Sequence, residues 1–251
     1  FGHSTATPFP EIILATFNTN PATGFVIAGV GVSELMGFAV SRAGDIDGDG
    51  GDDIIVSAIN ADYSVRTNMG ISYVLYGTPA SPSAVPSLAP TLQPSTKPTV
   101  QATAQPSQTA QSGFRVIGEK GTDNSGYAVS GAGDVNADGI DDFMIGAIST
   151  DYLSVLNTGT VYVVFGAFGR SYADVDLRNI TSTGAGFRII STLGIELGTS
   201  LSRAGDLNGD VSDDIIIGRY KAGSVVGRAF VSFGHDVFTP GGGLYVPGPF
   251  D

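Results

Sequence analysis

Ser130-Gly-Ala-Gly-Asp134-Val-Asn136-Ala-Asp138-Gly139-Ile-Asp141-Asp142-Phe-Met-Ile-Gly-Ala147 is the stretch that decides the fold, because its pattern occurs three times in the chain. The acidic loop inside it, 134–142, returns at 45–53 and at 206–214. Oxygen-bearing side chains stand at loop positions 1, 3, 5 and 9 in each copy. Ca²⁺ takes about six to eight oxygen ligands, and a short loop of alternating carboxylates supplies them. The spacing therefore predicts calcium sites.

The predicted ligands are the side chains at positions 1, 3, 5 and 9 and the backbone carbonyl at position 7, for up to three Ca²⁺ ions. They are Asp45, Asp47, Asp49, the Gly51 carbonyl and Asp53 in loop 1; Asp134, Asn136, Asp138, the Ile140 carbonyl and Asp142 in loop 2; and Asp206, Asn208, Asp210, the Ser212 carbonyl and Asp214 in loop 3. The acidic residues at position 8, Asp52, Asp141 and Asp213, are expected to point away or to support the ligands.

Two other interpretations of the loops are weaker. An EF-hand needs a bidentate Glu at position 12, where this chain has Val56, Ile145 and Ile217. A plain surface turn would also be rich in Asp, Asn and Gly, but one spacing used three times is not easily a coincidence. Loop 3 is the least certain site, since Val211 replaces a glycine at a position expected to prefer a left-handed backbone.

Composition favours an all-β protein, with Gly-rich turns between short apolar runs. The 251 residues include 36 Gly and 13 Pro but no Cys or Trp, with a formal net charge of −12. More than half of the 24 acidic residues lie in the three loops. Without a basic face, nucleic acid and anionic membranes are poor partners. The absence of Cys excludes disulfides, thiolate metal sites and a Cys nucleophile, and the apolar runs are too short to span a bilayer.

Alignment on the loops gives three repeat units, 24–77, 113–166 and 186–234. Each is expected to form four short strands, with the acidic loop between the second and the third, and no segment has a helical period. The expected fold class is therefore all-β, with tandem four-stranded antiparallel blades of the β-propeller type. The expected strands are Gly24–Val30, Met36–Gly44, Ile54–Ile59 and Ile71–Gly77; Gly113–Glu119, Ser125–Gly133, Phe143–Ile148 and Thr160–Gly166; and Gly186–Thr192, Leu197–Gly205, Ile215–Gly218 and Arg228–Gly234.

The segments between units differ in character. Residues 78–112 are rich in Pro, Ser and Thr, which predicts either an extended, O-glycosylated rod or a plain disordered linker. Residues 167–185 are an ordinary connection that contains the N-glycosylation sequon Asn179-Ile-Thr181. Residues 1–23 begin with Phe1-Gly2, like the end of a preceding unit, and 235–251 match the start of the next connection. We therefore expect the chain to be a window of a longer tandem array.

The recurring motifs resemble FG-GAP repeats, the units of the integrin alpha-subunit β-propeller and of many surface proteins. The resemblance is carried by the Phe-Gly endings, the Gly-Phe openings, the Ser-x-Ala-Gly-Asp run of Ser41–Asp45 and Ser202–Asp206, and Ile145-Gly-Ala147 after loop 2. It implies that each unit is a four-stranded blade whose acidic loop binds Ca²⁺. The Gly-Ala-Pro signature is degraded here, and three blades are fewer than the family closes into a ring.

Three functions follow as alternatives. The first is an extracellular, calcium-stabilised structural or adhesion protein whose blades assemble with other copies into a surface filament or hair. The second is a closed, integrin-like propeller that binds protein or glycan ligands. The third, a calcium-dependent hydrolase, is disfavoured because the sequence has no nucleophile elbow, phosphate loop or zinc motif. Its two histidines, His3 and His235, both follow a Phe-Gly ending and are repeat-related. No catalytic residue is therefore predicted.

Overall fold

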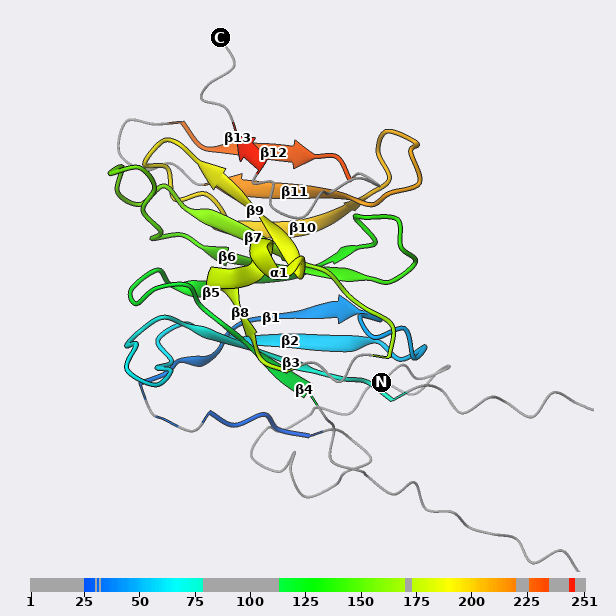
Figure 1. The fold of residues 1–251 in the computed structure, drawn as a ribbon, viewed down its shortest axis with the longest axis horizontal. Coiled ribbons are helices and arrows are strands. Elements are labelled where there is room, and N and C mark those ends of the chain that lie inside the picture. The colour runs from blue at the N-terminus through cyan, green and yellow to red at the C-terminus, as the bar shows by residue number, and fades with distance from the viewer. Residues whose placement is uncertain are drawn as a thin grey trace, which may run out of the picture.

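The strands of this protein form three sheets that are stacked in chain order, the first at the bottom of Figure 1 and the third at the top. A computed structural model describes residues 25–29, 31, 33–78, 113–169, 173–219, 226–234 and 244–246. The strands are β1 (Met36–Gly44), β2 (Asp53–Ala58), β3 (Ile71–Leu75), β4 (Gly113–Ile117), β5 (Ser125–Gly133), β6 (Asp142–Ala147), β7 (Thr160–Val164), β8 (Val175–Asp176), β9 (Gly186–Ser191), β10 (Ser200–Gly205), β11 (Asp214–Arg219), β12 (Arg228–Ser232) and β13 (Leu244–Val246).

We call the three sheets blades. Blade 1 is the antiparallel ladder β1-β2-β3-β4, and blade 2 is the antiparallel ladder β5-β6-β7-β9. Blade 3 contains β10, β11 and β12 among the described residues. Two short strands extend the outer edges in parallel, since β8 pairs with β4 and β13 pairs with β9. The predicted fold class, all-β with tandem antiparallel blades, is confirmed.

The blades and the sequence repeat are offset by one strand. β4 begins the unit 113–166, yet it pairs with β3 and completes blade 1. In the same way β9 begins the unit 186–234 and completes blade 2 by pairing with β7. The Gly-Phe strand of each unit therefore belongs to the sheet before it, which ties neighbouring blades together through the chain. The expectation that one unit supplies all four strands of one sheet is corrected accordingly.

The predicted strand Gly24–Val30 is absent from the ladders of the described residues. Residues 25–29 of this segment form no strand. Its equivalents β4 and β9 each pair with the last strand of the preceding blade. The described residues contain no blade before blade 1, so this segment has no ladder to join.

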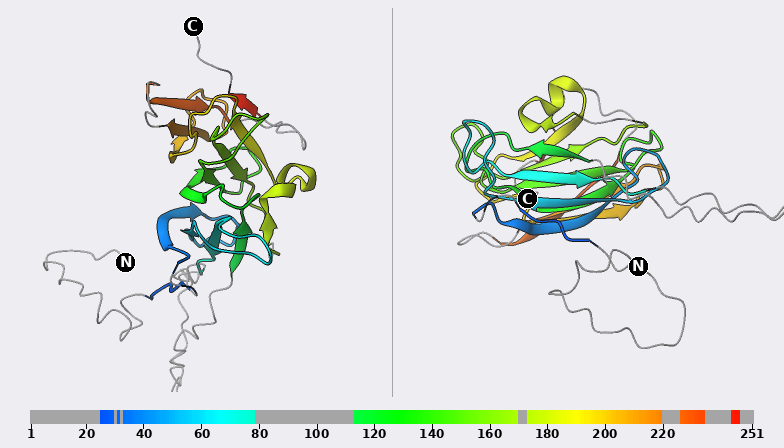
Figure 2. Two further views of the ribbon diagram at one scale, coloured as in Figure 1. Left: turned by 90° about the vertical axis from the view of Figure 1, so that its left-hand side faces the viewer. Right: turned by 90° about the horizontal axis from the view of Figure 1, so that it is seen from below.

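Apolar side chains are buried between the blades rather than inside a single layer. One core lies between blades 1 and 2 and includes Phe114 and Phe143; the other lies between blades 2 and 3 and includes Val163 and Ile215. Blade 2 is covered on both faces, as the face-to-face arrangement in Figure 2 shows. This explains why β6 and β7 are continuous apolar runs, because a strand buried on both sides does not alternate.

One short helical segment was not expected from the sequence. Leu177–Asn179 forms a 3-10 turn that leads into α1 (Ile180–Thr183), and Leu177 and Ile180 are buried in the first core. A single turn is too short to show a 3.6-residue period, so the sequence pattern could not reveal it. No described helix is long and apolar enough to cross a bilayer.

Several predictions fall wholly or partly on residues outside the described ranges. These are the end of a preceding unit at 1–23, nearly all of the Pro/Ser/Thr-rich linker 78–112, and most of the connection 235–251. Asn179 of the sequon is described and exposed just before α1, and its glycosylation stays a prediction.

Candidate metal centres

Each acidic loop joins the first two strands of its blade: loop 1 (45–53) follows β1, loop 2 (134–142) follows β5 and loop 3 (206–214) follows β10. The loops fold by hydrogen bonds from their own backbone to their acidic side chains. Asp45 at position 1 accepts the N–H of Asp49 at 3.0 Å and the N–H of Gly50 at 2.9 Å. The same two bonds recur at Asp134 and at Asp206, so the three loops share one local conformation.

Positions 3 and 5 point into the same small space. Asp47 accepts the N–H of Asp49 at 3.1 Å, and Asp49 accepts the N–H of Gly51 at 2.7 Å. As a result, one carboxylate oxygen from each of Asp45, Asp47 and Asp49 lies within 4.8 Å of the other two. These repeated turns bring together the three carboxylates of loop 1 that the sequence spacing predicts to be ligands.

Loops 2 and 3 replace one of these carboxylates by an amide. Asn136 accepts the backbone N–H of Asp138 at 3.0 Å through its amide oxygen and donates its amide N–H to a carboxylate oxygen of Asp138 at 3.0 Å. Asn208 makes the same pair of bonds with Asp210, at 3.0 and 2.8 Å. The amide relieves the repulsion between carboxylates that loop 1 retains. At positions 1, 3 and 5 loop 1 therefore carries three carboxylates, whereas loops 2 and 3 carry two each.

The aspartate at position 9 is buried in every loop. Asp53, Asp142 and Asp214 are at most 1% exposed. Each carboxylate accepts one N–H from loop position 2 and one from the Phe-Gly or Tyr-Gly ending of its blade. In loop 2 these bonds come from Val135 at 3.0 Å and Gly166 at 2.8 Å. The bonds to Asp53 and Asp214 follow the same pattern. Position 9 thus fastens the loop to the closing strand.

Burial makes the negative charge at position 9 of loops 1 and 2 unfavourable when no cation is near. Desolvation, with smaller contributions from Asp47 and Asp45, raises the pKa of Asp53 to about 6 against the backbone hydrogen bonds that lower it. Burial likewise raises the pKa of Asp142 well above its usual value. The pKa of Asp47 is also raised, chiefly by desolvation and then by its acidic neighbours. A divalent cation among these carboxylates would reverse the effect by favouring their ionised forms.

The donor set fits Ca²⁺. All the side chains that converge are hard oxygen donors, and none of the position 9 carboxylates makes an ion pair among the described residues. In loop 1 the converging carboxylates of Asp45, Asp47 and Asp49 would hold the ion, whereas Asp53 lies outside that group and its ligation stays a prediction. In loops 2 and 3 one amide stands in place of a carboxylate. The position 7 residues Gly51, Ile140 and Ser212 donate their N–H groups to position 5, and ligation by their carbonyls stays a prediction.

Position 8 has a role that the sequence did not reveal, namely joining one blade to the next. Asp141 of loop 2 accepts the N–H of Asp45 in loop 1 at 3.1 Å, and its own N–H donates to the Asp45 carbonyl at 3.3 Å. Asp213 of loop 3 makes the same reciprocal bonds with Asp134 of loop 2, at 2.9 and 2.8 Å. We call each pair of bonds a clasp.

Glycine makes each clasp possible. Gly44 and Gly133 precede the clasped aspartates and have φ of +92° and +73°. A Cβ at Gly44 would overlap the Asp141 carboxylate, and a Cβ at Gly133 would overlap the Asp213 carboxylate. The Ala-Gly-Asp run contains both the glycine and the first aspartate of each clasp. The second aspartate lies in the next blade, so local spacing could not identify it.

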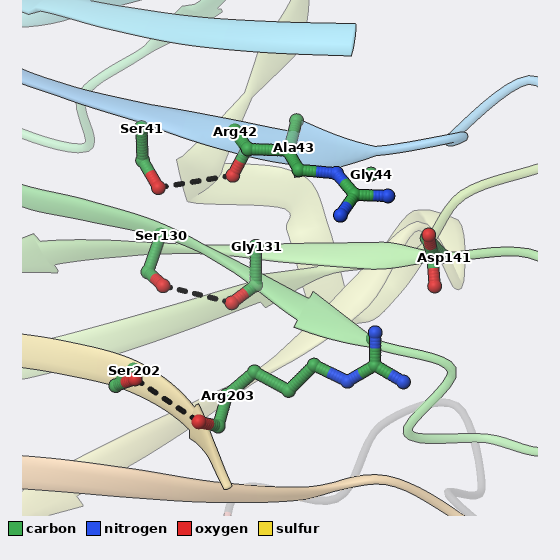
Figure 3. Close-up of a pocket in the computed structure, with 10 residues that line it drawn as sticks. Ser41, Arg42, Ala43, Gly44, Ser130, Gly131, Asp141, Ser202 and Arg203 are labelled. Atoms are coloured by element: carbon green, nitrogen blue, oxygen red, sulfur yellow. Dashed lines mark hydrogen bonds between the residues drawn. The ribbon is translucent and has the colours of Figure 1, made fainter. Parts of the chain in front are cut away.

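The clasps border a small groove where the first strands of the three blades lie side by side (Figure 3). Ser41, Ser130 and Ser202 occupy equivalent places there, and each hydroxyl donates to the carbonyl of the following residue at 2.8–3.0 Å. Arg203 pairs with Asp213 at 2.7 Å and Arg42 pairs with Asp52 at 2.6 Å. The groove holds only about 180 Å³. We therefore assign it to blade packing.

Loop 3 carries the backbone feature that its sequence predicts. Val211 has φ of +82°, matching Gly50 and Gly139 at +88°. A left-handed backbone is unfavourable for a β-branched residue. We expect Val211→Gly to stabilise loop 3 by about 1 kcal/mol, the relief of strain being offset in part by the entropy of glycine. Val211 is 83% exposed, so little packing is lost.

The measurement is chemical denaturation together with the calcium affinity of loop 3. The reverse change, Gly139→Val in loop 2, is the matched control and should be destabilising. A loss of stability in Val211→Gly would show that the strain is not relieved.

The fold and these loops define an all-β array of blades with acidic, oxygen-rich loops. The chain is similar to integrin alpha pat-2 of Caenorhabditis elegans, with 30% identity over 109 residues, and to integrin alpha-PS2 of Drosophila melanogaster, with 27% identity over 129 residues. These matches cover 43% and 51% of the chain but 8% of each relative, so the chain spans a small part of the relatives it matches. No protein-family profile matches the sequence. The similarity supports an integrin-like FG-GAP relationship.

Proposed function

We propose that the chain is a calcium-stabilised array of β-blades with a structural or adhesive role outside the cell. The observation that carries the proposal is one loop conformation used three times, which in loop 1 brings the carboxylates of Asp45, Asp47 and Asp49 together. Ca²⁺ bound there would neutralise the repulsion within the loop and hold the loop against the closing strand through position 9. The similarity to integrin alpha chains supports the adhesive part of the proposal.

The proposed location is the cell surface or the extracellular space. Millimolar calcium outside the cell fills weak loop sites of this kind, whereas they would stay largely empty at resting cytosolic levels. The proposed partners are other copies or blades of the same assembly and protein or glycan ligands. The proposal assigns no catalytic role and no nucleic-acid partner to the chain.

A second candidate function is ligand binding by a closed, integrin-like propeller, and the similarity to integrin alpha chains favours it. The two candidates differ in how blade 1 and blade 3 are covered. In a closed ring both are covered within one particle, so electron microscopy would show discrete rings. In a structural array they contact further copies, and the images would show open, extended particles.

The test of the proposal is calcium-dependent stability. We expect Ca²⁺ to raise the midpoint of thermal unfolding, because an ion that binds only the folded state adds about 2.7 kcal/mol per site at 100 times its Kd. One kcal/mol corresponds to about 2–4 °C for a chain of this length. A chelator should reverse the shift, and calorimetric titration should count up to three ions. An unchanged midpoint would overturn the calcium proposal.

Variants at position 5 provide the matched series. Asp49→Ala, Asp138→Ala and Asp210→Ala each remove one predicted ligand, and each should lower the calcium stoichiometry by one. Glu34→Gln removes one negative charge outside the loops and should leave the stoichiometry unchanged. Mg²⁺ at equal ionic strength should stabilise less, because it demands a regular octahedral site.

A further inference from the structure

The interface between blades 1 and 2 is built from the same positions as the interface between blades 2 and 3. Each blade presents a trailing face to the next blade. On blade 1 this face includes Ile46, Val74 and Tyr76, which are 0%, 1% and 8% exposed. The equivalent Val135 and Val163 of blade 2 are 1% and 0% exposed, and both lie in the second core. A clasp accompanies each interface.

The trailing face of blade 3 carries the same kinds of residue, but they are exposed. Leu207, Val231 and Phe233 are equivalent to Ile46, Val74 and Tyr76, and they are 59%, 48% and 56% exposed. Gly205 keeps the left-handed backbone of Gly44 and Gly133, with φ of +72°. Among the described residues a Cβ at Gly205 would meet nothing within 4 Å, and none of their aspartates from another blade fills the space. This face has the features of an interface without its partner.

Blade 1 has the complementary leading face. Val40 is 66% exposed, whereas its equivalent Val129 in blade 2 is 7% exposed and packs in the first core. Asp52 stands at position 8 of loop 1, where Asp141 and Asp213 form the clasps, and its side chain is 60% exposed. Asp52 pairs with Arg42 of its own blade, as Asp213 pairs with Arg203. Blade 1 therefore holds one unused half of a clasp and blade 3 holds the other.

The strand edges complement each other in the same way. Blades 1 and 2 end in the Gly-Phe strands β4 and β9, whose Phe114 and Phe187 are buried. Blade 3 ends at β12 among the described residues. The Gly-Phe segment of the first unit forms no strand in its described part, and its Phe25 is 49% exposed. An unpaired edge of this kind accepts an extended segment as an additional strand.

We propose that the two end faces bind each other, so that blade 1 of a second copy packs on the trailing face of blade 3. In this head-to-tail contact Asp52 of the second copy would form the clasp beside Gly205. Residues 25–29 of the second copy would pair with β12, with Phe25 opposite Val231 as Phe187 is opposite Val163. The contact is heterologous, so its repetition gives a filament or a ring. This inference rests on the proposed structural role, and the partner is a second copy of this chain.

The experiment is sedimentation velocity of the 251-residue chain in saturating Ca²⁺, from dilute to concentrated solution. We expect the mass to rise with concentration in steps of 25.6 kDa. Gly205→Asn should weaken association about 30-fold or more, because its side chain fills the space that Asp52 of the second copy would occupy, while asparagine tolerates the left-handed backbone. Val40→Lys should weaken association from the other face. Leu153→Lys, on an exposed loop of blade 2 away from both faces, is the matched control.

Mixing the two variants tests the polarity of the contact. Gly205→Asn retains an intact leading face and Val40→Lys an intact trailing face, so two copies that are monomeric alone should form one dimer together and grow no further. A chain that stays monomeric at every concentration would overturn the inference, as would complexes that neither variant weakens. Calcium binding measured on the same samples separates this outcome from failure of the proposed function.

Discussion

We expect Gly133→Ala to open the clasp between blades 2 and 3 and to lower the free energy of unfolding by about 3–4 kcal/mol. Two effects add at this residue. Its φ of +73° is unfavourable for alanine, which costs about 1–2 kcal/mol. The new methyl group would also overlap the Asp213 carboxylate and the Arg203 guanidinium, so the clasp between Asp134 and Asp213 must open.

Gly205→Ala is the control that separates the two effects. Its φ of +72° imposes the same backbone strain, but a Cβ there meets nothing within 4 Å. Dilute, monomeric protein should therefore lose only about 1–2 kcal/mol in this variant. Urea denaturation gives the two stabilities, and hydrogen exchange of loops 2 and 3 locates the opening. Equal losses in the two variants would show that the clasp contributes nothing to stability.

The sequence predicted the blades well because each strand is defined locally. The predicted strand Met36–Gly44 is β1 with the same bounds, and the predicted strand Ser125–Gly133 is β5. These strands end at the glycines just before the acidic loops, so the strand pattern and the turn residues indicate the same boundary. The turns of the loops were also predictable, since aspartates that accept backbone N–H groups two to five residues ahead act within the loop.

Several features that escaped the sequence depend on contacts between units. The segment Gly24–Val30 has the composition of β4 and β9, but a strand needs a neighbouring ladder, and spacing within the unit does not say where that ladder is. Asp141 and Asp213 resemble other loop aspartates in sequence, although their partners lie 96 and 79 residues earlier in the chain. The sequence also did not show that the Asn136 and Asn208 amides donate hydrogen bonds within their loops. An asparagine at position 3 is read equally well as a metal ligand or as a hydrogen-bond donor.

The burial of position 9 changes the meaning of the predicted ligand set. The spacing treats Asp134 and Asp142 as equal ligands, yet Asp134 is only partly buried and Asp142 is fully buried. Asp142 already accepts two backbone N–H groups, so it is a structural residue whether or not an ion is present. Ca²⁺ would then bind a loop whose conformation is already held by hydrogen bonds, and position 9 would connect the bound ion to the rest of the blade.

Asp142→Ala is expected to lower the free energy of unfolding by about 2–5 kcal/mol even without calcium, because two buried N–H groups lose their acceptor. These are the N–H of Val135 in the loop and the N–H of Gly166 at the end of the blade. Asp138→Ala is the matched variant in the same loop. Asp138 accepts the exposed N–H of Ile140 and lies at the surface, so its loss should cost about 1 kcal/mol in chelator.

The response to Ca²⁺ should differ from that of wild-type protein in both variants, since both lack one predicted ligand of loop 2. Each should therefore gain less stability from Ca²⁺ than wild-type protein does, although only Asp142→Ala should have a low free energy of unfolding in chelator. Asp142→Asn adds a third comparison. It keeps one acceptor oxygen and removes a charge whose burial raises the pKa of Asp142, so in chelator it should be more stable than Asp142→Ala. Denaturation in chelator and in calcium measures all three, and an Asp142→Ala protein as stable as Asp138→Ala in chelator would contradict the structural role of position 9.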